Sequence, residues 1–283
     1  MRAVSLHRDV LVVTSAVLHV NCVIVRGGGG AADPRGGEMG QGAGTEGGDE
    51  TFVIDSPVLP EELEALPALL AQAQFPAPSG LLATHGDWDH LLGRFAFPEI
   101  ALGCAQSTAA RLRDSPGEAQ RALRRFDEDL MIERPRPLAL GSPQALPVPG
   151  RCELGACELE LHVADGHTPD GMAIVIGWAR TLVASDYLSD REIPTLSEGG
   201  DPHAYLATLE RLRPLIAGSD HVVPGHGSVM DRAQALAVLE QDVGYVNALV
   251  ENSAAAELPK GRGGAAQRRL HARNLAVLQP PAS

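Results

Sequence analysis

The sequence is poor in aromatic residues and in cysteine. Aromatic side chains make up 4% of the 283 residues, whereas hydrophobic residues of all kinds make up 44%. A sizeable core is therefore available, but it has to be built from Leu, Val, Ala and Ile. The four cysteines are too few and too scattered for a disulfide scaffold, and they lack the CxxC spacing of a structural zinc site. We expect reduced thiols and a cytoplasmic protein, with a Cys152–Cys157 contact across a hairpin as the alternative.

Long apolar runs and basic residues are also scarce. No stretch reaches the roughly 20 apolar residues that a membrane helix needs, and Met1 to Val13 lack the features of a secretory signal. With 23 Lys and Arg against 36 Asp and Glu, the formal net charge is −13. A field of that sign repels phosphate backbones and anionic membranes. We therefore expect a small-molecule substrate and neither a nucleic-acid nor a membrane partner. The sequence does not indicate an oligomeric state.

Residues 27–50 are dominated by glycine, acidic and small residues. Such a segment cannot bury enough surface to offset the entropy lost on ordering, so we predict a long, flexible hairpin loop. The loop would connect strands at Asn21–Val25 and Thr51–Asp55. A phosphate-binding loop is the alternative, but the GxxxxGK[ST] pattern is absent and no helix start follows.

Short apolar runs and amphipathic segments alternate along the remaining sequence, which predicts α/β layers around a sheet core. Further strands are expected at residues 10–13, 81–84, 100–104, 157–163, 172–176, 181–184 and 221–223. Helices are expected at 60–74, 91–97, 107–114, 118–132, 202–216 and 233–250. Arg134–Gly150, with five prolines, is predicted to be a connecting loop. The segment from Ala254 onward predicts a loosely held tail with one late helix near residues 271–278.

Residues 84–90, with the sequence THGDWDH, concentrate metal-binding side chains directly after an apolar run. On an extended segment His85, Asp87 and Asp89 share one side, and His90 begins the next element. Imidazole and carboxylate groups at this density suit divalent transition metals, and two of each are enough to divide between two ions. The alternative is a solvated turn whose acidic residues cap the following helix.

Three more apolar strands end in a metal-capable residue, namely His167, Asp186 and His226, each beside a turn with Gly or Pro. Strand ends along one sheet edge are where open α/β proteins bind ligands. In this order the motifs resemble the metallo-β-lactamase fold superfamily, hydrolases that include glyoxalase II and quorum-quenching lactonases. The resemblance covers about residues 10–250. The resemblance depends on the strand at residues 21–25 and on five motifs: VIDSP at 53–57, HGDWDH at 85–90, GHTPDG at 166–171, SDYL at 185–188 and VPGHG at 223–227.

The resemblance implies a four-layer αββα sandwich in residues 1–250, followed by a partly helical or disordered tail at 251–283. It also implies two divalent metal ions, with zinc expected. The ligands would be His85, Asp87 and His167 for the first ion, Asp89, His90 and His226 for the second, and Asp186 for both. A hydroxide bridging the ions would attack an ester, thioester, lactone or related bond. Asp89 would be catalytic by orienting that water, and Asp55 would form hydrogen bonds beneath the site.

Asp87 departs from the HxHxDH pattern that most members of the superfamily share. The flavodiiron branch has HxExDH and binds iron, but Asp is one methylene shorter than Glu, so direct ligation by Asp87 is in question. If Asp87 ligates, its charge and hard oxygen favour iron or manganese over zinc. Two alternatives to hydrolysis follow. One is a diiron redox or oxygen-handling protein, disfavoured because the chain is too short for a flavodoxin-like domain. The other is a metal-poor, non-catalytic binding relative.

The remaining histidines are expected to be structural, except that His19 could line the mouth of the pocket. Ser56, Ser185 and the cysteines lack a neighbouring His/Asp arrangement, so nucleophilic catalysis by a side chain is not expected.

Overall fold

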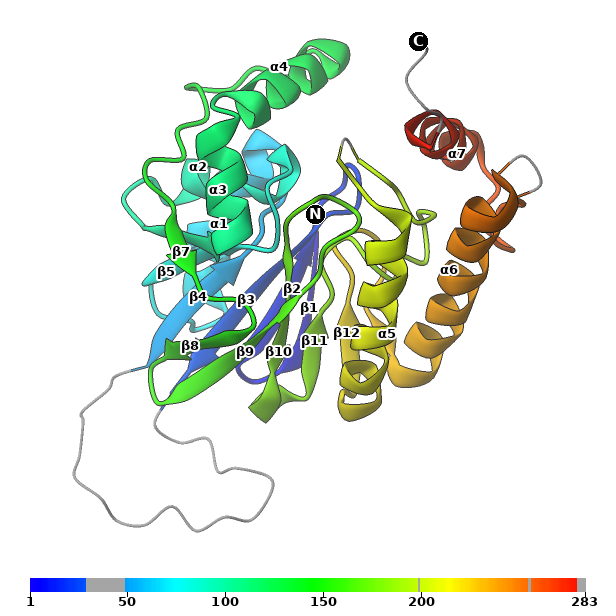
Figure 1. Cartoon of the computed structure of the whole chain (residues 1–283). Coiled ribbons are helices and arrows are strands. Elements are labelled where there is room, and N and C mark those ends of the chain that lie inside the picture. The colour runs from blue at the N-terminus through cyan, green and yellow to red at the C-terminus, as the bar shows by residue number, and fades with distance from the viewer. Residues whose placement is uncertain (29–48, 198, 254–255, 279–283) are drawn as a thin grey trace.

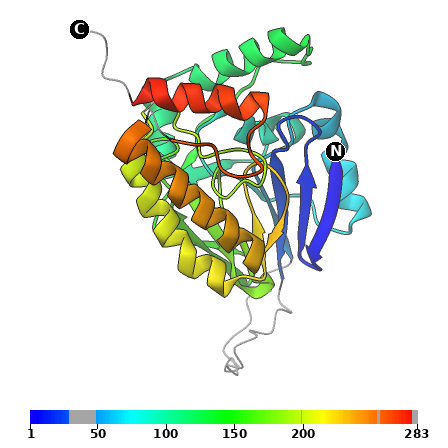
Figure 2. The same ribbon diagram turned by 90° about the vertical axis from the view of Figure 1, so that its right-hand side faces the viewer.

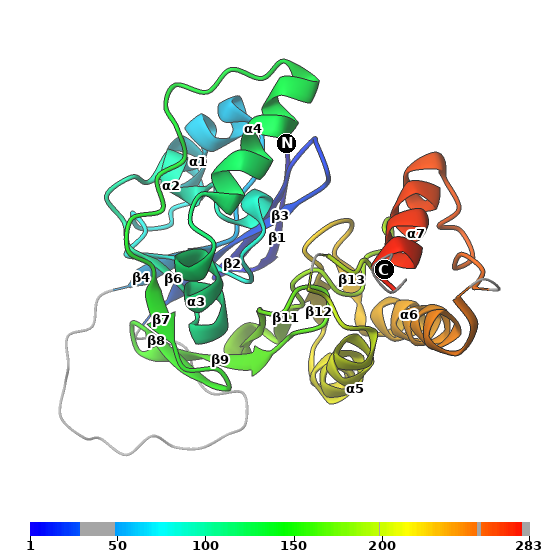
Figure 3. The ribbon, with the colours of Figure 1, turned by 45° about the horizontal axis from the view of Figure 1, so that its top comes forward.

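The computed structural model of the protein describes residues 1–28, 49–197, 199–253 and 256–278. In this part of the chain two β-sheets pack face to face, and helices cover the outer face of each sheet (Figure 1; Figure 3). The layers therefore run helix, sheet, sheet, helix, which confirms the predicted αββα sandwich.

The first sheet contains seven strands in the order β1 to β7. They are β1 (Arg2–His7), β2 (Val10–Thr14), β3 (Asn21–Gly27), β4 (Glu50–Ile54), β5 (Gly80–Ala83), β6 (Leu102–Ala105) and β7 (Gln144–Leu146). Neighbours are antiparallel as far as β4 and parallel from β4 to β7. Its helices are α1 (Pro60–Gln72), α2 (Gly93–Ala96), α3 (Gln106–Asp114) and α4 (Glu118–Leu130).

The second sheet contains six strands in the order β13, β12, β11, β10, β9, β8. They are β8 (Gly150–Leu154), β9 (Cys157–Val163), β10 (Met172–Ile176), β11 (Thr181–Val183), β12 (His221–Val223) and β13 (Met230–Asp231). Only β11 and β12 are parallel. The helices on this side are α5 (Pro202–Gly218), α6 (Arg232–Asn252) and α7 (Ala265–Val277), and none of the described helices is long and apolar enough to span a membrane.

Strand β3 explains why an apolar run without alternation forms a central strand. Its side chains point to opposite faces in turn. Cys22 and Ile24 belong to the core between the first sheet and its helices. Val23 and Val25 belong to the core between the two sheets. Both faces of the strand are thus buried in aliphatic cores, which is what a continuous hydrophobic sequence requires.

The predicted glycine-rich loop lies, for residues 29–48, outside the described residues. Its flanking strands β3 and β4 pair antiparallel, as expected, with Gly27 opposite Glu50 and Val23 opposite Ile54. The alternative of a Cys152–Cys157 contact is wrong, because the strand register places Cys152 opposite Leu159. All four cysteines are free.

Two of the sequence expectations need correction, one for a connecting segment and one for the C-terminal segment. Arg134–Gly150 is not only a loop, because it contains β7 and reaches the start of β8. A three-residue edge strand next to prolines has too little periodicity to be recognised. The C-terminal helix begins at Ala265, and the described residues 256–278 are not loosely held, because Arg262 and Asn274 are buried. Figure 2 shows α7 lying across the ends of α5 and α6. Helix α7 also packs on the core that α5 and α6 form with the second sheet.

Candidate metal centre

Strand ends from both sheets bring the predicted metal-binding residues to one edge of the sandwich. β4 runs parallel to β5, and β11 runs parallel to β12, so the carboxyl ends of each pair lie side by side. β5 leads into the 84–90 segment, in which Trp88–His90 form a 3-10 helix. Three loops of the second sheet supply the others, with His167 after β9, Asp186 after β11 and His226 after β12.

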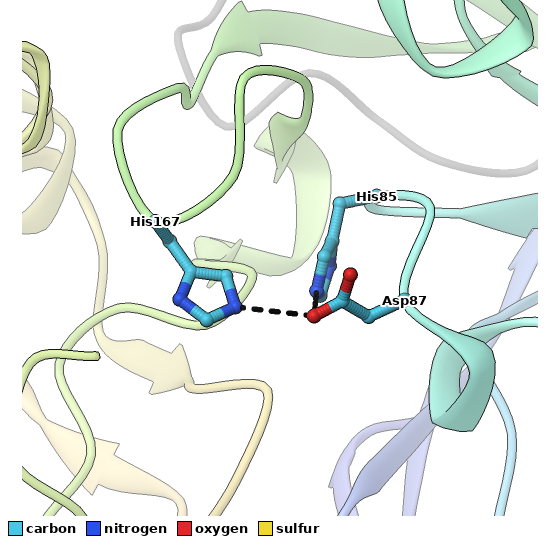
Figure 4. A group of neighbouring side chains, drawn as sticks. All are labelled: His85, Asp87 and His167. Atoms are coloured by element: carbon cyan, nitrogen blue, oxygen red, sulfur yellow. Dashed lines mark ion pairs between the residues drawn. The ribbon is translucent and has the colours of Figure 1, made fainter. Parts of the chain in front are cut away.

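The first group consists of His85, Asp87 and His167 (Figure 4). Asp87 Oδ2 lies 3.8 Å from His85 Nε2 and 3.6 Å from His167 Nε2. Asp186 Oδ2 faces the same two nitrogens, at 3.8 Å and 3.4 Å respectively. Asp87 Oδ2 therefore faces the same point as the Nε2 atoms of His85 and His167, although the Asp side chain is short.

The second group consists of Asp89, His90 and His226. Asp89 Oδ2 lies 3.9 Å from His90 Nε2 and 3.4 Å from His226 Nε2, and the two nitrogens are 3.4 Å apart. Asp186 Oδ1 is 3.1 Å from His90 Nε2, and Asp186 Oδ2 is 3.2 Å from His226 Nε2. Asp186 thus lies between the two groups and reaches histidines of both.

The Nδ1 atom of each histidine contacts a protein oxygen on the side away from the cluster. Backbone carbonyls serve two of them, with Thr195 O 2.7 Å from His167 and Leu18 O 2.9 Å from His226. His90 Nδ1 lies 3.0 Å from Asp55 Oδ2. His85 Nδ1 lies 3.2 Å from Thr84 Oγ1 and 3.3 Å from Ser185 Oγ. Contacts of this kind orient an imidazole ring and leave its Nε2 available as a ligand, although the His90–Asp55 contact lacks hydrogen-bond geometry.

The expectation for Asp55 is confirmed. Besides contacting His90, its carboxylate accepts hydrogen bonds from the backbone N–H of Thr84 at 2.8 Å and from the Thr84 hydroxyl at 2.9 Å. Asp55 therefore ties the start of the 84–90 segment to the histidine at its end. The carboxylate lies beneath the cluster and is not a member of either donor group.

The donor atoms fit metal ions in spacing and in chemistry. Two atoms each about 2.1 Å from a tetrahedral ion lie about 3.4 Å apart, close to the separations found here. Among the described residues, His85 Nε2 and His167 Nε2 are buried without a hydrogen-bond partner. Buried polar atoms rarely stay unpaired, and a bound ion would account for both. The set of imidazoles and carboxylates is thus suited to divalent metal ions.

The raised pKa values of two histidines indicate that the cluster attracts positive charge. Burial alone would lower the pKa of His226, but the nearby Asp186 charge outweighs it and raises the pKa to about 10. The pKa of His167 is likewise raised to about 9 against burial, chiefly by its contacts with Asp87 and Asp186. The carboxylates crowded here attract protons when no cation is present, and a metal ion would replace those protons.

Glycine is required where the last predicted motif approaches the cluster. A Cβ atom at Gly225 would collide with Asp186 Oδ1 and the backbone of Ser185. The absence of a side chain thus lets the loop after β12 pass directly over Asp186 and place His226 beside it.

A cavity of about 240 Å³ opens beside the cluster and includes residues that the sequence did not single out. Glu192 contributes from the loop after Asp186, and Leu270 and Arg273 contribute from α7. His19 is not among the residues that line this cavity, whereas its neighbour Leu18 is. These wall residues lie on irregular or terminal segments, where sequence periodicity carries no signal about tertiary contacts.

Arg111 is the other residue that the sequence reasoning missed. It lies on α3, and its guanidinium is 2.9 Å from Asp87 Oδ1. No local pattern identifies it. The available signal was indirect: a carboxylate placed among metal ligands in a buried loop needs a partner of opposite charge.

Solved structures share this arrangement of layers. A metallo-β-lactamase family protein from Thermus thermophilus matches with a TM-score of 0.65, over 97% of this chain and 93% of its own, at 19% identity. A metallo-β-lactamase from Pontibacter korlensis matches with a TM-score of 0.58, over 84% and 98%, at 17% identity. For the B3 metallo-β-lactamase BLEG-1 the TM-score is 0.57, over 80% and 95%, at 19% identity.

The chain therefore has the metallo-β-lactamase fold, and the resemblance drawn from the motifs holds at the level of the fold. Comparison of the sequence with protein-family models and with curated proteins gives no match.

Proposed function

We propose that the protein is a dinuclear metal-dependent hydrolase that acts on an ester, thioester, lactone or related bond of a small molecule. The observation that carries the proposal is the convergence of seven His and Asp side chains. They form two separate three-donor groups and a third group, His85, His90 and Asp186, that joins them. The small cavity beside the cluster favours a small substrate. The net charge of −13 disfavours nucleic acid as a partner.

Two divalent cations, when bound, would make a water molecule more acidic and polarise the attacked carbonyl group. The protein residues would position these reactants. Asp89 lines the cavity and lies 3.4 Å from His226, so its carboxylate is placed to orient a water and to accept its proton. The fixed Nδ1 contacts keep the imidazoles from rotating when substrate binds.

Glu192 is the cavity residue suited to deliver a proton to the leaving group. Burial raises the pKa of its carboxyl, the charge of His226 opposes this, and the charges of Asp186 and Asp89 raise it further. A carboxyl beside the cluster can donate to a departing oxygen or sulfur atom when it holds a proton. Glu192→Gln should therefore keep the metal and slow substrates with poor leaving groups more than activated esters. Equal slowing of both kinds of substrate would remove Glu192 from this role.

Zinc is the metal that we propose first, with iron or manganese as the alternatives. The specific observation favouring the alternatives is the Asp87 oxygen aimed at His85 and His167, because a hard anionic ligand suits iron and manganese better than an imidazole does. Two bound irons would favour a redox or oxygen-handling function, and sub-stoichiometric metal without turnover would favour a non-catalytic binding role.

The deciding experiment measures metal content and hydrolysis together. Protein would be purified, analysed for metals, stripped with a chelator and reloaded, then assayed on a panel of esters, thioesters, lactones and phosphodiesters. His226→Ala should lose one equivalent of metal and most turnover, whereas His203→Ala, at an exposed site on α5, should change neither. Full turnover with two metals retained in His226→Ala would refute the assignment. Failure to bind metal would refute the hydrolase proposal as a whole.

A further inference from the structure

Asp87 is held by a cation that comes from outside the metal-binding loops. One guanidinium nitrogen of Arg111 lies 2.9 Å from Asp87 Oδ1. The other carboxylate oxygen, Oδ2, is the one that faces His85 and His167. The carboxylate is therefore divided, with one oxygen paired to Arg111 and the other presented to the first donor group. A side chain held in this way can give a metal ion only a single oxygen.

Arg111 is itself fixed by two further carboxylates. It lies 2.9 Å from Asp170 Oδ1 and 2.7 Å from Glu118 Oε1. The Asp170 side chain is only 1% exposed, and its second oxygen accepts a hydrogen bond from the backbone N–H of Gly86 at 2.9 Å. Asp170 thus connects Arg111 to the loop that carries Asp87. The planar guanidinium suits this role because it presents several donors in fixed directions.

Gly86 lies where this pair approaches the loop. A Cβ atom there would come within 3.2 Å of Asp170 Oδ2 and 3.3 Å of Arg111 Cδ, which is tighter than side chains normally tolerate. A side chain between His85 and Asp87 would therefore press on the Arg111–Asp170 pair, which would have to move by a few tenths of an ångström. Loop, arginine and buried aspartate form one connected unit.

The charges explain what this unit accomplishes. With neutral imidazoles, Asp87, Asp89 and Asp186 give the two donor groups three negative charges. Arg111 is largely buried, at 16% exposure, and a guanidinium keeps its positive charge in proteins. One positive charge at 2.9 Å lowers the negative potential of Asp87, although Arg111 shares that charge with Asp170 and Glu118.

We propose that Arg111 is a positioning residue that makes Asp87 a single-oxygen ligand of the first metal ion and lowers its negative potential. Asp87, held in this way, offers the first site one donor atom, as a histidine would. The inference rests on the proposed metal centre and adds to it a residue in neither donor group. It predicts that Arg111 controls the affinity of the first site and leaves that of the second site nearly unchanged.

The test titrates metal-depleted protein with zinc, and with cobalt as a spectroscopic probe, and determines two dissociation constants. Arg111→Met keeps the aliphatic stem and removes the charge. It should weaken one site about 10- to 100-fold, as loss of a group that orients a ligand does, and should alter the cobalt spectrum of that site alone. Arg111→Lys should fall between, because a point charge persists without the planar fork. Arg113→Met, at an exposed arginine of the same helix, should match the wild type.

The double variant Asp87→His/Arg111→Met separates positioning from a general structural role. Asp87→His alone sets an imidazole beside a guanidinium that has lost one of its three carboxylates, and should bind the first ion poorly. Removing Arg111 as well should restore a neutral ligand and two tight sites. Circular dichroism and melting temperature would verify that each variant is folded.

Two results would overturn the inference while the hydrolase proposal stands. One is wild-type affinity at both sites in Arg111→Met. The other is that Arg111→Met weakens the first site equally whether residue 87 is Asp or His. A wild-type protein that binds fewer than two divalent ions would instead overturn the two-metal proposal, and this inference with it.

Discussion

Asn274 on α7 donates a hydrogen bond from Nδ2 to the carbonyl oxygen of Pro194, 2.7 Å away. Its Oδ1 accepts from the backbone N–H of Leu196 at 2.9 Å. Thr195, between these two residues, has the carbonyl oxygen that lies 2.7 Å from His167 Nδ1. One buried amide in the C-terminal helix therefore holds the loop that orients a predicted metal ligand.

Asn274→Ala should weaken both the fold and the first metal site. The substitution leaves the Pro194 carbonyl and the Leu196 N–H without their buried partner, whereas the Tyr245 hydroxyl keeps its contact with His271. Unsatisfied buried groups cost about 1–3 kcal/mol, so the melting temperature should fall by several degrees. Metal content should fall because His167 loses its fixed contact.

Gln267→Ala provides the matched control. Gln267 is also on α7 and also bonds to this loop, at the carbonyl oxygen of Arg191, but the contact is exposed. We expect almost no change in melting temperature or metal content. If Asn274→Ala behaves like this control, α7 does not position His167.

The donor cluster could be predicted because its residues share one simple context. Asp87, His167, Asp186 and His226 each follow an apolar strand, and strand ends at one sheet edge meet in space. The apolar runs themselves predicted the layers, since Cys22 to Val25 are buried on both faces. Both inferences use only local pattern and the geometry of sheets.

Arg111 and Asn274 could not be found in that way. Arg111 reaches Asp87 only because α3 packs beside the 84–90 segment, and its sequence neighbours are ordinary helix residues. Asn274 lies in a stretch of Ala and Arg with little amphipathic pattern, so its burial depends on how α7 docks. Contacts between elements far apart in sequence leave no periodic signal.

Asp55→Asn should weaken the second metal site while leaving the first nearly intact. Asparagine keeps one oxygen to accept from the Thr84 N–H but loses the negative charge beside His90 Nδ1. Removing a carboxylate that orients a histidine ligand typically lowers metal affinity about 10- to 100-fold. Zinc titration of metal-depleted protein would measure the change.

Asp220→Asn is the control for Asp55→Asn, because Asp220 forms its ion pairs with Arg180 and Arg232 at the exposed surface. Its two zinc affinities should equal those of the wild type. Unchanged affinities in Asp55→Asn as well would show that the carboxylate beneath His90 contributes nothing to metal binding.

Replacing residues 29–48 with a short turn should leave metal content unchanged and turnover within a few-fold. The flanking residues Gly27 and Glu50 pair at one end of the β3–β4 ladder, whereas Ile54 leads into Asp55 at the other end. The attachment points of the replaced segment are therefore remote from the donor cluster, and shortening a connection costs little stability. A folded, metal-loaded variant without activity would show that these residues contribute to the site.

The stability of the metal-free protein should fall as the pH rises from about 7 to 10. In the metal-free fold the pKa of His226 is raised to about 10 and that of His167 to about 9, by the neighbouring carboxylates against the effect of burial. An unfolded histidine titrates near about 6.5. A group whose pKa is higher in the folded state stabilises that state fully below its unfolded pKa, and this contribution disappears as the pH passes the folded value.

The melting temperature of chelator-treated protein at pH 7 and pH 10 measures this effect. It should drop clearly between the two, and His226→Ala should drop less because one of the raised pKa values is gone. With metal bound, the imidazoles are neutral ligands at both pH values, so the loaded wild type should also drop less. Loading at pH 7 should release protons into the solution, because the ions displace protons held by these histidines. A metal-free protein equally stable at pH 7 and pH 10 would mean that its histidines are already neutral at pH 7.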